Sequence, residues 1–284
     1  MKMKVIRTIS EMKAWARETH SAGLTIGFVP TMGYLHEGHL SLIRQAKKQS
    51  DRLVVSIYVN PTQFGPNEDW NKYPRDFKRD QHLCEQEGVD LVFYPDDRQM
   101  YNPNHRTYIV TEELASVLCG RSRPNHFRGV TTVVAKLFHI VQPDVAVFGQ
   151  KDAQQAILIR RMIEDLNFDV KLIVAPIVRE RDGLALSSRN KYLTSEERKQ
   201  ATVLYRSLQR AEQEYKNGNR DAEQIKRKMM AMIEQQPLAH LDYVELRDAE
   251  TLGPARTGQR DVLVAVAVFF GSTRLIDNTV LKTR

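Results

Sequence analysis

The sequence is poor in cysteine and in long hydrophobic runs, and each absence excludes a class of protein. Only two cysteines, Cys84 and Cys119, occur among 284 residues, far apart and without a CxxC pair. This pattern argues against a disulfide framework and against a zinc knuckle. The longest strongly apolar run, Val262 to Phe270, is shorter than the about 20 residues that a transmembrane helix requires. We therefore expect a buried strand there.

Targeting and cofactor-binding signatures are also absent. The amino-terminal stretch MKMKVIRTISEMKAWARETH alternates charged and apolar residues and lacks the apolar stretch and cleavage site of a signal peptide, so a cytoplasmic location is the default expectation. No GxxxxGK(S/T) loop occurs, and no GxGxxG follows the first expected strand. Their absence argues against a P-loop NTPase and against a nicotinamide or flavin enzyme.

The net charge of +7 suits either a nucleic-acid-binding protein or an enzyme that handles anions such as ATP and carboxylates. The Lys and Arg residues are scattered, and the densest patch, Lys226 to Lys228, lies in a helical pattern with acidic residues upstream. Such a patch is typical of a solvated helix face. We therefore expect neither a nucleic-acid partner nor a membrane partner.

Short apolar runs alternate with stretches of helical period from Thr25 to about Ile177. This alternation predicts the α/β class, with a doubly wound, Rossmann-like parallel sheet covered by helices on both faces. Beyond it, Thr194 and Glu197 form a capping box at the head of a long helix, and a second helix and two strands follow. We predict a Rossmann-like domain at residues 1–180 and a smaller α+β domain at residues 181–284.

In a doubly wound sheet, ligands bind beyond the carboxyl ends of the strands, where the strand order reverses. Four junctions between expected elements carry chemically active side chains: PTMGYLHEGH, NPTQFGP, FGQKDAQQ and VRERDGLALSSRN. These junctions are the candidate site.

The first junction holds two histidines at an expected helix start. Gly33 permits an unusual turn, and Gly38 permits a close approach of the main chain to a ligand. We expect a helix to begin at His39, so that His36 and His39 lie on one side of an N-terminus suited to phosphate. Surface histidines that cap a loop are the alternative. Zinc is disfavoured, because no HExxH or cysteine cluster completes a ligand set.

Two other junctions carry positive charge. Lys151 stands at a helix start, where it adds charge to an anion-binding end although the helix dipole repels it. An ordinary surface lysine is the alternative. In LSSRN, Ser187 and Ser188 can donate to phosphate oxygens, and Arg189 offers a planar fork. An interdomain linker with a common salt bridge is the alternative there.

The junction after the next strand suits a small polar substrate. Asn60 and Gln63 can supply several hydrogen bonds, and Phe64 can supply an apolar wall. Further along, Asp80 can help to hold Mg²⁺, which usually takes one or two carboxylates together with substrate phosphates. A solvent-facing helix residue is the alternative for Asp80.

Together these motifs resemble the HIGH-type nucleotidylyltransferase superfamily, with HEGH as its first motif and LSSRN as its second. The closer similarity is to the pantoate–β-alanine ligase family, since PTMGYLHEGH, VNPTQF, YPRDFKRD, RPNHFRGV, FGQKDAQQ and GLALSSRN occur in its order and at suitable spacing. The resemblance is dense from about Gly27 to Asn190 and thinner through the later RLIDN stretch. Gln150 and Leu186 depart from the glutamate and methionine of many members.

The resemblance implies ATP-dependent condensation of (R)-pantoate with β-alanine to pantothenate, AMP and pyrophosphate, through a pantoyl-adenylate intermediate. It also implies Mg²⁺, a homodimer, and closure of the carboxyl-terminal domain as a lid. Another small-molecule adenylyltransferase of the same superfamily is the alternative. A noncatalytic RNA-binding relative of aminoacyl-tRNA synthetases is kept as a second alternative because of the positive charge.

The resemblance further implies roles for individual residues. The expected catalytic residues are His36, His39, Lys151 and Arg189, and the expected metal ligand is Asp80. Nucleotide contacts are expected from Met32, Gly33, Tyr34, Leu35, His36, Glu37, Gly38, His39, Gly149, Gln150, Lys151, Asp152, Val178, Leu186, Ser187, Ser188 and Arg189. Pantoate contacts are expected from Pro30, Thr31, Met32, Gln63 and Gln155. Arg123 and residues 126–128 are expected in the wall or lid of the site.

Overall fold

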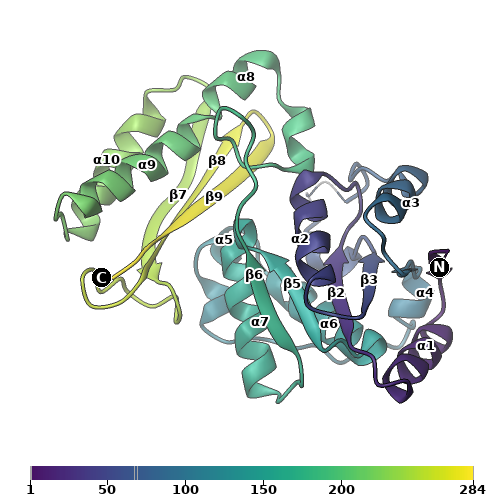
Figure 1. Ribbon diagram of the computed structural model, residues 1–284. Helices are drawn as coiled ribbons and strands as arrows, with labels where there is room; N and C mark the ends of the chain where they lie inside the picture. Colours follow the sequence, from purple (N-terminus) through teal and green to yellow (C-terminus); the bar gives the residue numbers. More distant parts are fainter. Residues whose placement is uncertain (1, 67, 69, 284) are drawn as a thin grey trace. The chain divides into compact units, whose positions relative to one another are not determined.

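The computed structural model describes residues 2–66, 68 and 70–283. The chain divides into two compact units, each assembled from separate stretches of sequence (Figure 1). Unit 1 comprises Met1–Ala115, Arg123–Gly149 and Leu158–Pro176, and unit 2 comprises Ser116–Ser122, Gln150–Ile157 and Ile177–Arg284. The chain therefore passes between the units more than once.

Unit 1 is built on a six-stranded parallel sheet of order β1-β4-β3-β2-β5-β6. The strands are β1 (Lys4–Ile6), β2 (Ile26–Thr31), β3 (Arg52–Ile57), β4 (Leu91–Phe93), β5 (Val145–Gly149) and β6 (Lys171–Ala175). The chain adds β3 and β4 on one side of β2 and adds β5 and β6 on the other, so the order reverses between β2 and β5. This topology confirms the doubly wound α/β class.

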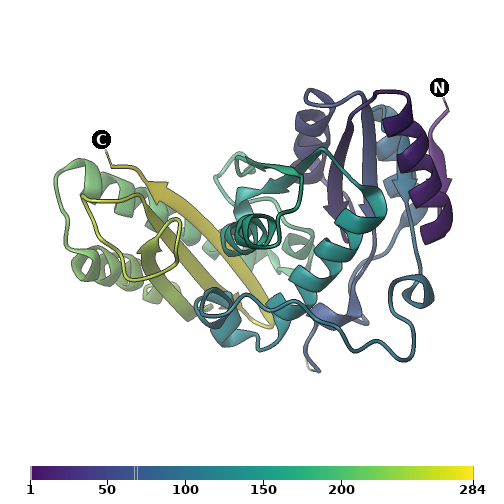
Figure 2. The same cartoon turned by 90° about the horizontal axis from the view of Figure 1, so that it is seen from below.

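Helices cover both faces of this sheet (Figure 2). On one face, Leu40 and Ile43 pack with Cys84, Val29 and Val55 in a single buried cluster. The helices of unit 1 are α1 (Ile9–Ser21), α2 (Glu37–Lys47), α3 (Phe77–Gln86), α4 (Asp97–Met100), α6 (His126–Val141) and the part of α7 (Ala153–Asp165) from Leu158 onward, with short 3-10 turns η1 (Pro61–Gln63) and η2 (Leu114–Ser116). Helix α6 contacts both α1 and β2.

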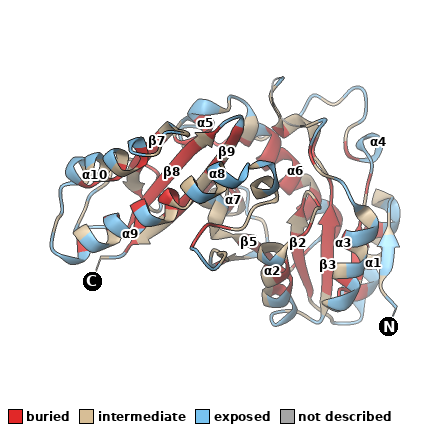
Figure 3. Cartoon of the chain, turned by 90° about the horizontal axis from the view of Figure 1, so that it is seen from above, coloured by how far each residue is buried: buried red, intermediate tan, exposed pale blue. Residues whose placement is uncertain are grey.

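Unit 2 is built on a three-stranded antiparallel sheet of order β7-β8-β9. Its strands are β7 (Ala239–Asp248), β8 (Val262–Phe270) and β9 (Thr273–Leu281). The central strand β8 is buried along almost its whole length (Figure 3), which confirms the buried strand expected from this apolar run.

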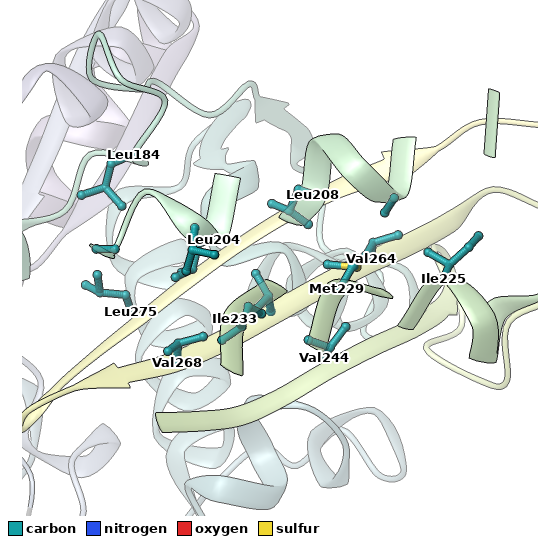
Figure 4. Close-up of a cluster of buried hydrophobic side chains, with 14 of the residues drawn as sticks. Leu184, Leu204, Leu208, Ile225, Met229, Ile233, Val244, Val264, Val268 and Leu275 are labelled. Carbon is teal, nitrogen blue, oxygen red and sulfur yellow. The ribbon is translucent and has the colours of Figure 1, made fainter. Parts of the chain in front are cut away.

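Helices pack on this sheet and complete the α+β fold of unit 2. Leu204 and Leu208 of α9 (Val203–Lys216) and Met229 of α10 (Ala222–Glu234) form one apolar cluster with Val264 and Val268 of β8 (Figure 4). The shorter elements are α5 (Cys119–Ser122), η3 (Gln150–Asp152), η4 (Ser188–Tyr192) and α8 (Ser195–Gln200).

Two features of unit 2 differ from expectation. The single long helix predicted from Thr194 is wrong, because α8 and α9 are separated by a tighter turn at Ala201 and Thr202. There the Thr202 hydroxyl donates to the Lys199 carbonyl at 2.8 Å, a local bond that competes with the helical pattern. Strand β9, which carries the RLIDN motif, has no counterpart among the predicted elements. Within the described part of the chain, no helix has the length and apolar character needed to cross a bilayer.

Candidate active site

The loops after β2 and β5 leave the sheet where its strand order reverses. Pro30 and Thr31 are the last residues of β2, and Gly149 is the last residue of β5. Because β2 and β5 are parallel neighbours, their carboxyl ends lie at the same edge of the sheet. Doubly wound sheets bind ligands at this edge. Two of the four predicted junctions therefore begin where a ligand site is expected.

The loop after β2 has an unusual main-chain conformation. Gly33 and Tyr34 have φ angles of 79° and 50°, a region that glycine adopts readily and tyrosine rarely. The Thr31 hydroxyl accepts a hydrogen bond from the Gly33 N–H at 3.1 Å and donates to the Ser56 carbonyl on β3 at 2.9 Å. The start of the loop is thus tied to the neighbouring strand.

Asp80 of α3 anchors the middle of the same loop. Its side chain is buried, and its two oxygens accept hydrogen bonds from the N–H groups of Tyr34 and Leu35, both at 2.7 Å. Burial raises the pKa of Asp80, while these two donors and the charge of Arg79 oppose the rise. The solvent-facing alternative for this residue is wrong.

The same contacts bear on the expected metal site. Each Asp80 oxygen accepts a hydrogen bond from a main-chain donor, so in this structure the residue anchors the loop, and its role as a Mg²⁺ ligand stays a prediction. Among the described residues, no group of three or more His, Cys, Asp or Glu side chains could hold a metal ion.

His36 and His39 cap helix α2, which begins at Glu37 and thus earlier than expected. The Nδ1 atom of His36 accepts from the Gly38 N–H at 3.1 Å, and Nδ1 of His39 accepts from the His36 N–H at 3.3 Å. The two rings lie 4.1 Å apart. A neutral imidazole whose Nδ1 accepts carries its proton on Nε2. Capping therefore makes each neutral ring an Nε2–H donor at a helix N-terminus, where anions are favoured.

Two members of this junction have side chains engaged by the protein. Leu35 is fully buried in the core of unit 1, so only its main-chain groups suit the expected nucleotide contact. The Glu37 carboxylate, which is half-exposed, forms an ion pair with Arg44.

Gln63, on η1, is a buried amide with both ends engaged. Its Oε1 accepts from Asn60 Nδ2 at 3.2 Å, and its Nε2 contacts Met32 Sδ at 2.9 Å. Asn60, itself buried, also donates to the Gly129 carbonyl at 3.1 Å. A Cβ on Gly129 would lie 2.4 Å from the Thr62 carbonyl oxygen, so glycine permits α6 to approach η1 closely. Unit 1 thus brings together two residues predicted to contact pantoate, Met32 and Gln63.

Arg123 and His126 hold the main chain of Gln63. His126 Nδ1 lies 2.8 Å from the Gln63 carbonyl, and Arg123 Nη1 lies 3.1 Å from His126 Nε2. A tautomer with the proton on Nδ1 satisfies both contacts. Arg123 also donates to Glu68 at 2.7 Å. Burial raises the pKa of Glu68, but the hydrogen bonds and charge of Arg123 outweigh it and hold the pKa below its usual value.

The predicted site residues of the last two junctions lie in unit 2, apart from Gly149. Lys151 is on η3, and the chain returns at Val178 to form a short hairpin, closed by a hydrogen bond from the Leu186 N–H to the Val178 carbonyl at 3.0 Å. Ser187 then caps η4, because its hydroxyl accepts from the Arg189 N–H at 3.2 Å. Val178, Leu186 and the LSSRN residues therefore belong to one continuous hairpin and turn. Gln155, half-buried on α7, also belongs to unit 2, whereas Gln63 belongs to unit 1.

Two residues that order unit 2, Asp277 and Asn278, were absent from the predicted site. Asn278 donates to the carbonyls of Gln150 and Lys151, and Asp277 pairs with Arg179 at the start of the hairpin. The available signal was the RLIDN stretch, in which the adjacent polar residues Asp277 and Asn278 follow the apolar pair Leu275 and Ile276.

The sequence is similar to one family over nearly its whole length. Residues 4–280 match the family described as pantoate-beta-alanine ligase. The pantothenate synthetase of Thermotoga petrophila is 58% identical over 279 residues, which cover 98% of this chain and 100% of that protein. The pantothenate synthetase of Fervidobacterium nodosum is 55% identical over 280 residues, 99% of this chain and 100% of that protein.

Solved structures show the same similarity. Pantothenate synthetase from Thermus thermophilus has 43% sequence identity and a TM-score of 0.91, with 98% of this chain and 99% of that chain covered. A pantoate-beta-alanine ligase from Francisella tularensis, complexed with beta-gamma ATP and beta-alanine, has 35% identity and a TM-score of 0.79, with 98% and 97% covered. The similarity thus extends through the sequence of both units.

Proposed function

The chain belongs to the pantoate–β-alanine ligase family, and we propose that it joins (R)-pantoate to β-alanine through a pantoyl-adenylate, with the residues of the four junctions binding ATP and pantoate. It is an ATP-dependent, AMP-forming ligase. The observation that carries the site assignment is the capped N-terminus of α2. There, two histidines present Nε2–H donors beside a helix end that favours anions.

In the first step, the pantoate carboxylate attacks the α-phosphate of ATP, a P–O bond forms, and pyrophosphate leaves. This step needs alignment and neutralisation of charge more than covalent help from the protein. We assign neutralisation of the phosphates to His36, His39, Lys151 and Arg189, with hydrogen bonds from Ser187 and Ser188 and from main-chain groups of the loop after β2. The Nδ1 caps support this role, since they orient both imidazoles before a ligand arrives.

Pantoate is assigned to the amides of Gln63 and Gln155, with Pro30, Thr31 and Met32 beside it. The support for Gln63 is its fixed amide: Asn60 donates to Oε1, which directs Nε2 as a donor. Nε2 carries two N–H donors, and one contacts Met32 Sδ, so the second can orient a hydroxyl or carboxylate of the substrate without a further loss of side-chain entropy.

In the second step, the β-alanine amine attacks the acyl carbon of the adenylate and AMP leaves. A closed site would protect the adenylate from water, and we assign closure to the smaller domain predicted at residues 181–284. We propose Mg²⁺ as a companion of the ATP phosphates without assigning it a protein carboxylate. The homodimer and the cytoplasmic location stay predictions.

The test is an assay of AMP formation with ATP, pantoate and β-alanine. The proposed reaction requires AMP release in repeated turnovers only when both cosubstrates are present. Repeated AMP release without β-alanine would favour the alternative of an adenylyltransferase for another acceptor. Salt-sensitive RNA binding with no AMP formation would favour the noncatalytic alternative.

A further inference from the structure

Strand β9 holds the Lys151 turn through the side chain of Asn278. Asn278 is buried, and its Nδ2 donates to the carbonyls of Gln150 at 2.9 Å and Lys151 at 3.0 Å. Its Oδ1 lies 3.4 Å from Gln150 Nε2. One amide therefore satisfies two successive carbonyls of η3, and this fixes the direction in which the Lys151 side chain leaves the main chain.

The neighbouring residue of β9 holds the hairpin that leads to LSSRN. Asp277 is buried and accepts two hydrogen bonds from the Arg179 guanidinium, at 2.6 and 3.0 Å. Arg179 also donates to the Gly183 carbonyl at 3.0 Å, and its guanidinium lies 4.5 Å from the centre of the Tyr205 ring. A Cβ on Gly183 would lie 1.9 Å from that ring, so the hairpin tip fits there only as glycine.

The hairpin in turn fixes the LSSRN turn. Asn190 Nδ2 donates to Glu180 Oε1 at 2.9 Å and to the Ala185 carbonyl at 3.1 Å. Strand β9 also packs against both η3 and η4, the turns that carry Lys151 and Arg189. Successive residues of a strand point to opposite faces, so Asp277 and Asn278 hold one segment on each side of β9.

We propose that Asp277 and Asn278 are positioning residues that set the Lys151 turn and the LSSRN turn in one fixed geometry for ATP. The inference rests on the proposed function, because Lys151 and Arg189 matter here as ligands of the nucleotide phosphates. Neither positioning residue touches the substrate in this account. Each acts through a segment that does.

A purely stabilising role explains these residues less well. A carboxylate and a guanidinium lose hydration when they are buried, and well-packed apolar residues of similar size often replace such a pair without loss of stability. Asp277 and Arg179 instead orient a specific hairpin, and Asn278 is matched to two main-chain carbonyls. We therefore assign these contacts chiefly to fixing the positions of the hairpin and the Lys151 turn, more than to raising the stability of the fold.

The experiment compares Asn278→Ala with Thr279→Ala, a matched control on the same strand. The Thr279 hydroxyl donates to Glu212 of α9 at 2.6 Å. Thr279→Ala therefore also removes a side-chain hydrogen bond of β9, but that bond does not involve any segment assigned to ATP binding. Pantoate-dependent exchange of pyrophosphate into ATP reports the first step, and thermal unfolding reports stability. We expect Asn278→Ala to slow exchange and raise the KM for ATP, by about 10- to 100-fold in kcat/KM, with the KM for β-alanine unchanged. Thr279→Ala should leave these constants near those of the unmodified enzyme.

A double-mutant cycle separates positioning from general damage. If Asn278 acts through Lys151, adding Asn278→Ala to Lys151→Ala should cause little further loss, because the positioned group is already absent. Losses that multiply would overturn the inference, as would an Asn278→Ala enzyme whose KM for ATP is unchanged.

Arg179→Lys serves as a milder variant should Asn278→Ala not fold. It keeps a cation beside Asp277 but loses the planar fork that reaches both Asp277 and Gly183. We expect a raised KM for ATP with the unfolding temperature little changed, and an unaltered KM would contradict the inference. The unmodified enzyme is assayed first. If it lacks AMP formation dependent on both cosubstrates, the proposed function fails, whereas an active enzyme with multiplying losses refutes the positioning role alone.

Discussion

The Nδ1 atom of His39 accepts a hydrogen bond from the main-chain N–H of His36, and the two imidazole rings lie 4.1 Å apart. Nδ1 of each ring is therefore engaged with the main chain at the start of α2. Because the proposed ligand contact uses Nε2, substitutions that keep one nitrogen's role and remove the other's can separate stability from catalysis.

His39→Asn and His39→Gln form a matched pair for that separation. Asparagine can supply an acceptor near the position of Nδ1, whereas glutamine can supply a donor near Nε2. We expect His39→Asn to keep most of the helix cap, which is worth about 0.5–2 kcal/mol, yet to lose about 10²- to 10³-fold in the rate of adenylate formation. His39→Gln should retain more activity. Stopped-time assays of pyrophosphate release and chemical unfolding measure the two effects. Equal activity in both variants would contradict a role for Nε2.

Asp80→Asn should disturb the loop after β2 without altering the metal requirement. The asparagine amide keeps one oxygen acceptor but replaces the other oxygen with an NH₂ group, which is a donor. One of the two main-chain N–H groups, of Tyr34 or Leu35, therefore loses its hydrogen-bond acceptor. We expect unfolding free energy to fall by about 1–3 kcal/mol and the KM for ATP to rise. The Mg²⁺ concentration that gives half-maximal rate should stay the same. A marked increase in that concentration would support Asp80 as a metal ligand.

Lys151→Ala should impair the first step alone. We assign the Lys151 ammonium to the negative charge of the ATP phosphates. Most of that charge departs with pyrophosphate at the end of the first step. We expect pantoate-dependent exchange to fall by about 10²-fold or more, because this charge is lost from a site of developing negative charge. When pantoyl-adenylate is supplied directly, its reaction with β-alanine should proceed at a rate close to that of the unmodified enzyme. A defect confined to amine attack would be inconsistent with this assignment.

Gln63→Glu tests the oriented amide. The carboxylate keeps an acceptor for Asn60 but loses the Nε2–H donor and adds negative charge next to a carboxylate substrate. We expect the KM for pantoate to rise by about 10-fold or more, since buried polar partners left unmatched commonly cost 1–3 kcal/mol. The KM for β-alanine should change little. Steady-state kinetics with each substrate varied in turn gives the comparison, and an unchanged KM for pantoate would remove Gln63 from the substrate site.

The Glu68 carboxylate predicts a pH dependence. Its pKa is lower in the folded chain than in the unfolded chain because the hydrogen bonds and charge of Arg123 outweigh burial. A lowered acid pKa contributes stability that is present above the unfolded value and is lost as pH falls through the folded value. Stability should therefore decline as pH falls below about 4.3, the usual pKa of glutamate, and the decline should be shallower in Glu68→Gln. Urea unfolding across this range measures both slopes.

Sequence patterns predicted the parallel sheet and the edge at which its polar junctions begin, because both features have local sequence signals. Alternating strands and helices indicate a doubly wound sheet, and its rule for ligand binding selects Pro30 to His39 and Gly149 to Lys151 without coordinates. The strand pairing of β2 with β5 then places the starts of both junctions at one edge. Both predictions thus depend only on the hydrophobic periodicity of each segment and on which residues directly follow a strand.

Other features depend on contacts between distant residues and left no local signal. Asp80 reads as an exposed helix residue until its partners, the N–H groups of Tyr34 and Leu35, are known. Strand β9 was missed because buried polar side chains interrupt its apolar pattern, and the residue that neutralises Asp277, Arg179, is far away in sequence. Contacts of this kind between distant residues determine whether a polar side chain is buried, and the local sequence around each residue does not reveal them.

The role of β9 has a consequence for the order in which the chain becomes competent on the ribosome. The Lys151 turn and the Val178 hairpin are synthesised well before β9, the last of the described elements. Until Asp277 and Asn278 have emerged, two carbonyls and a guanidinium in those segments lack their native partners. A nascent chain can therefore complete much of the parallel sheet of unit 1 before one late strand fixes the turns of unit 2 that we propose to bind phosphate.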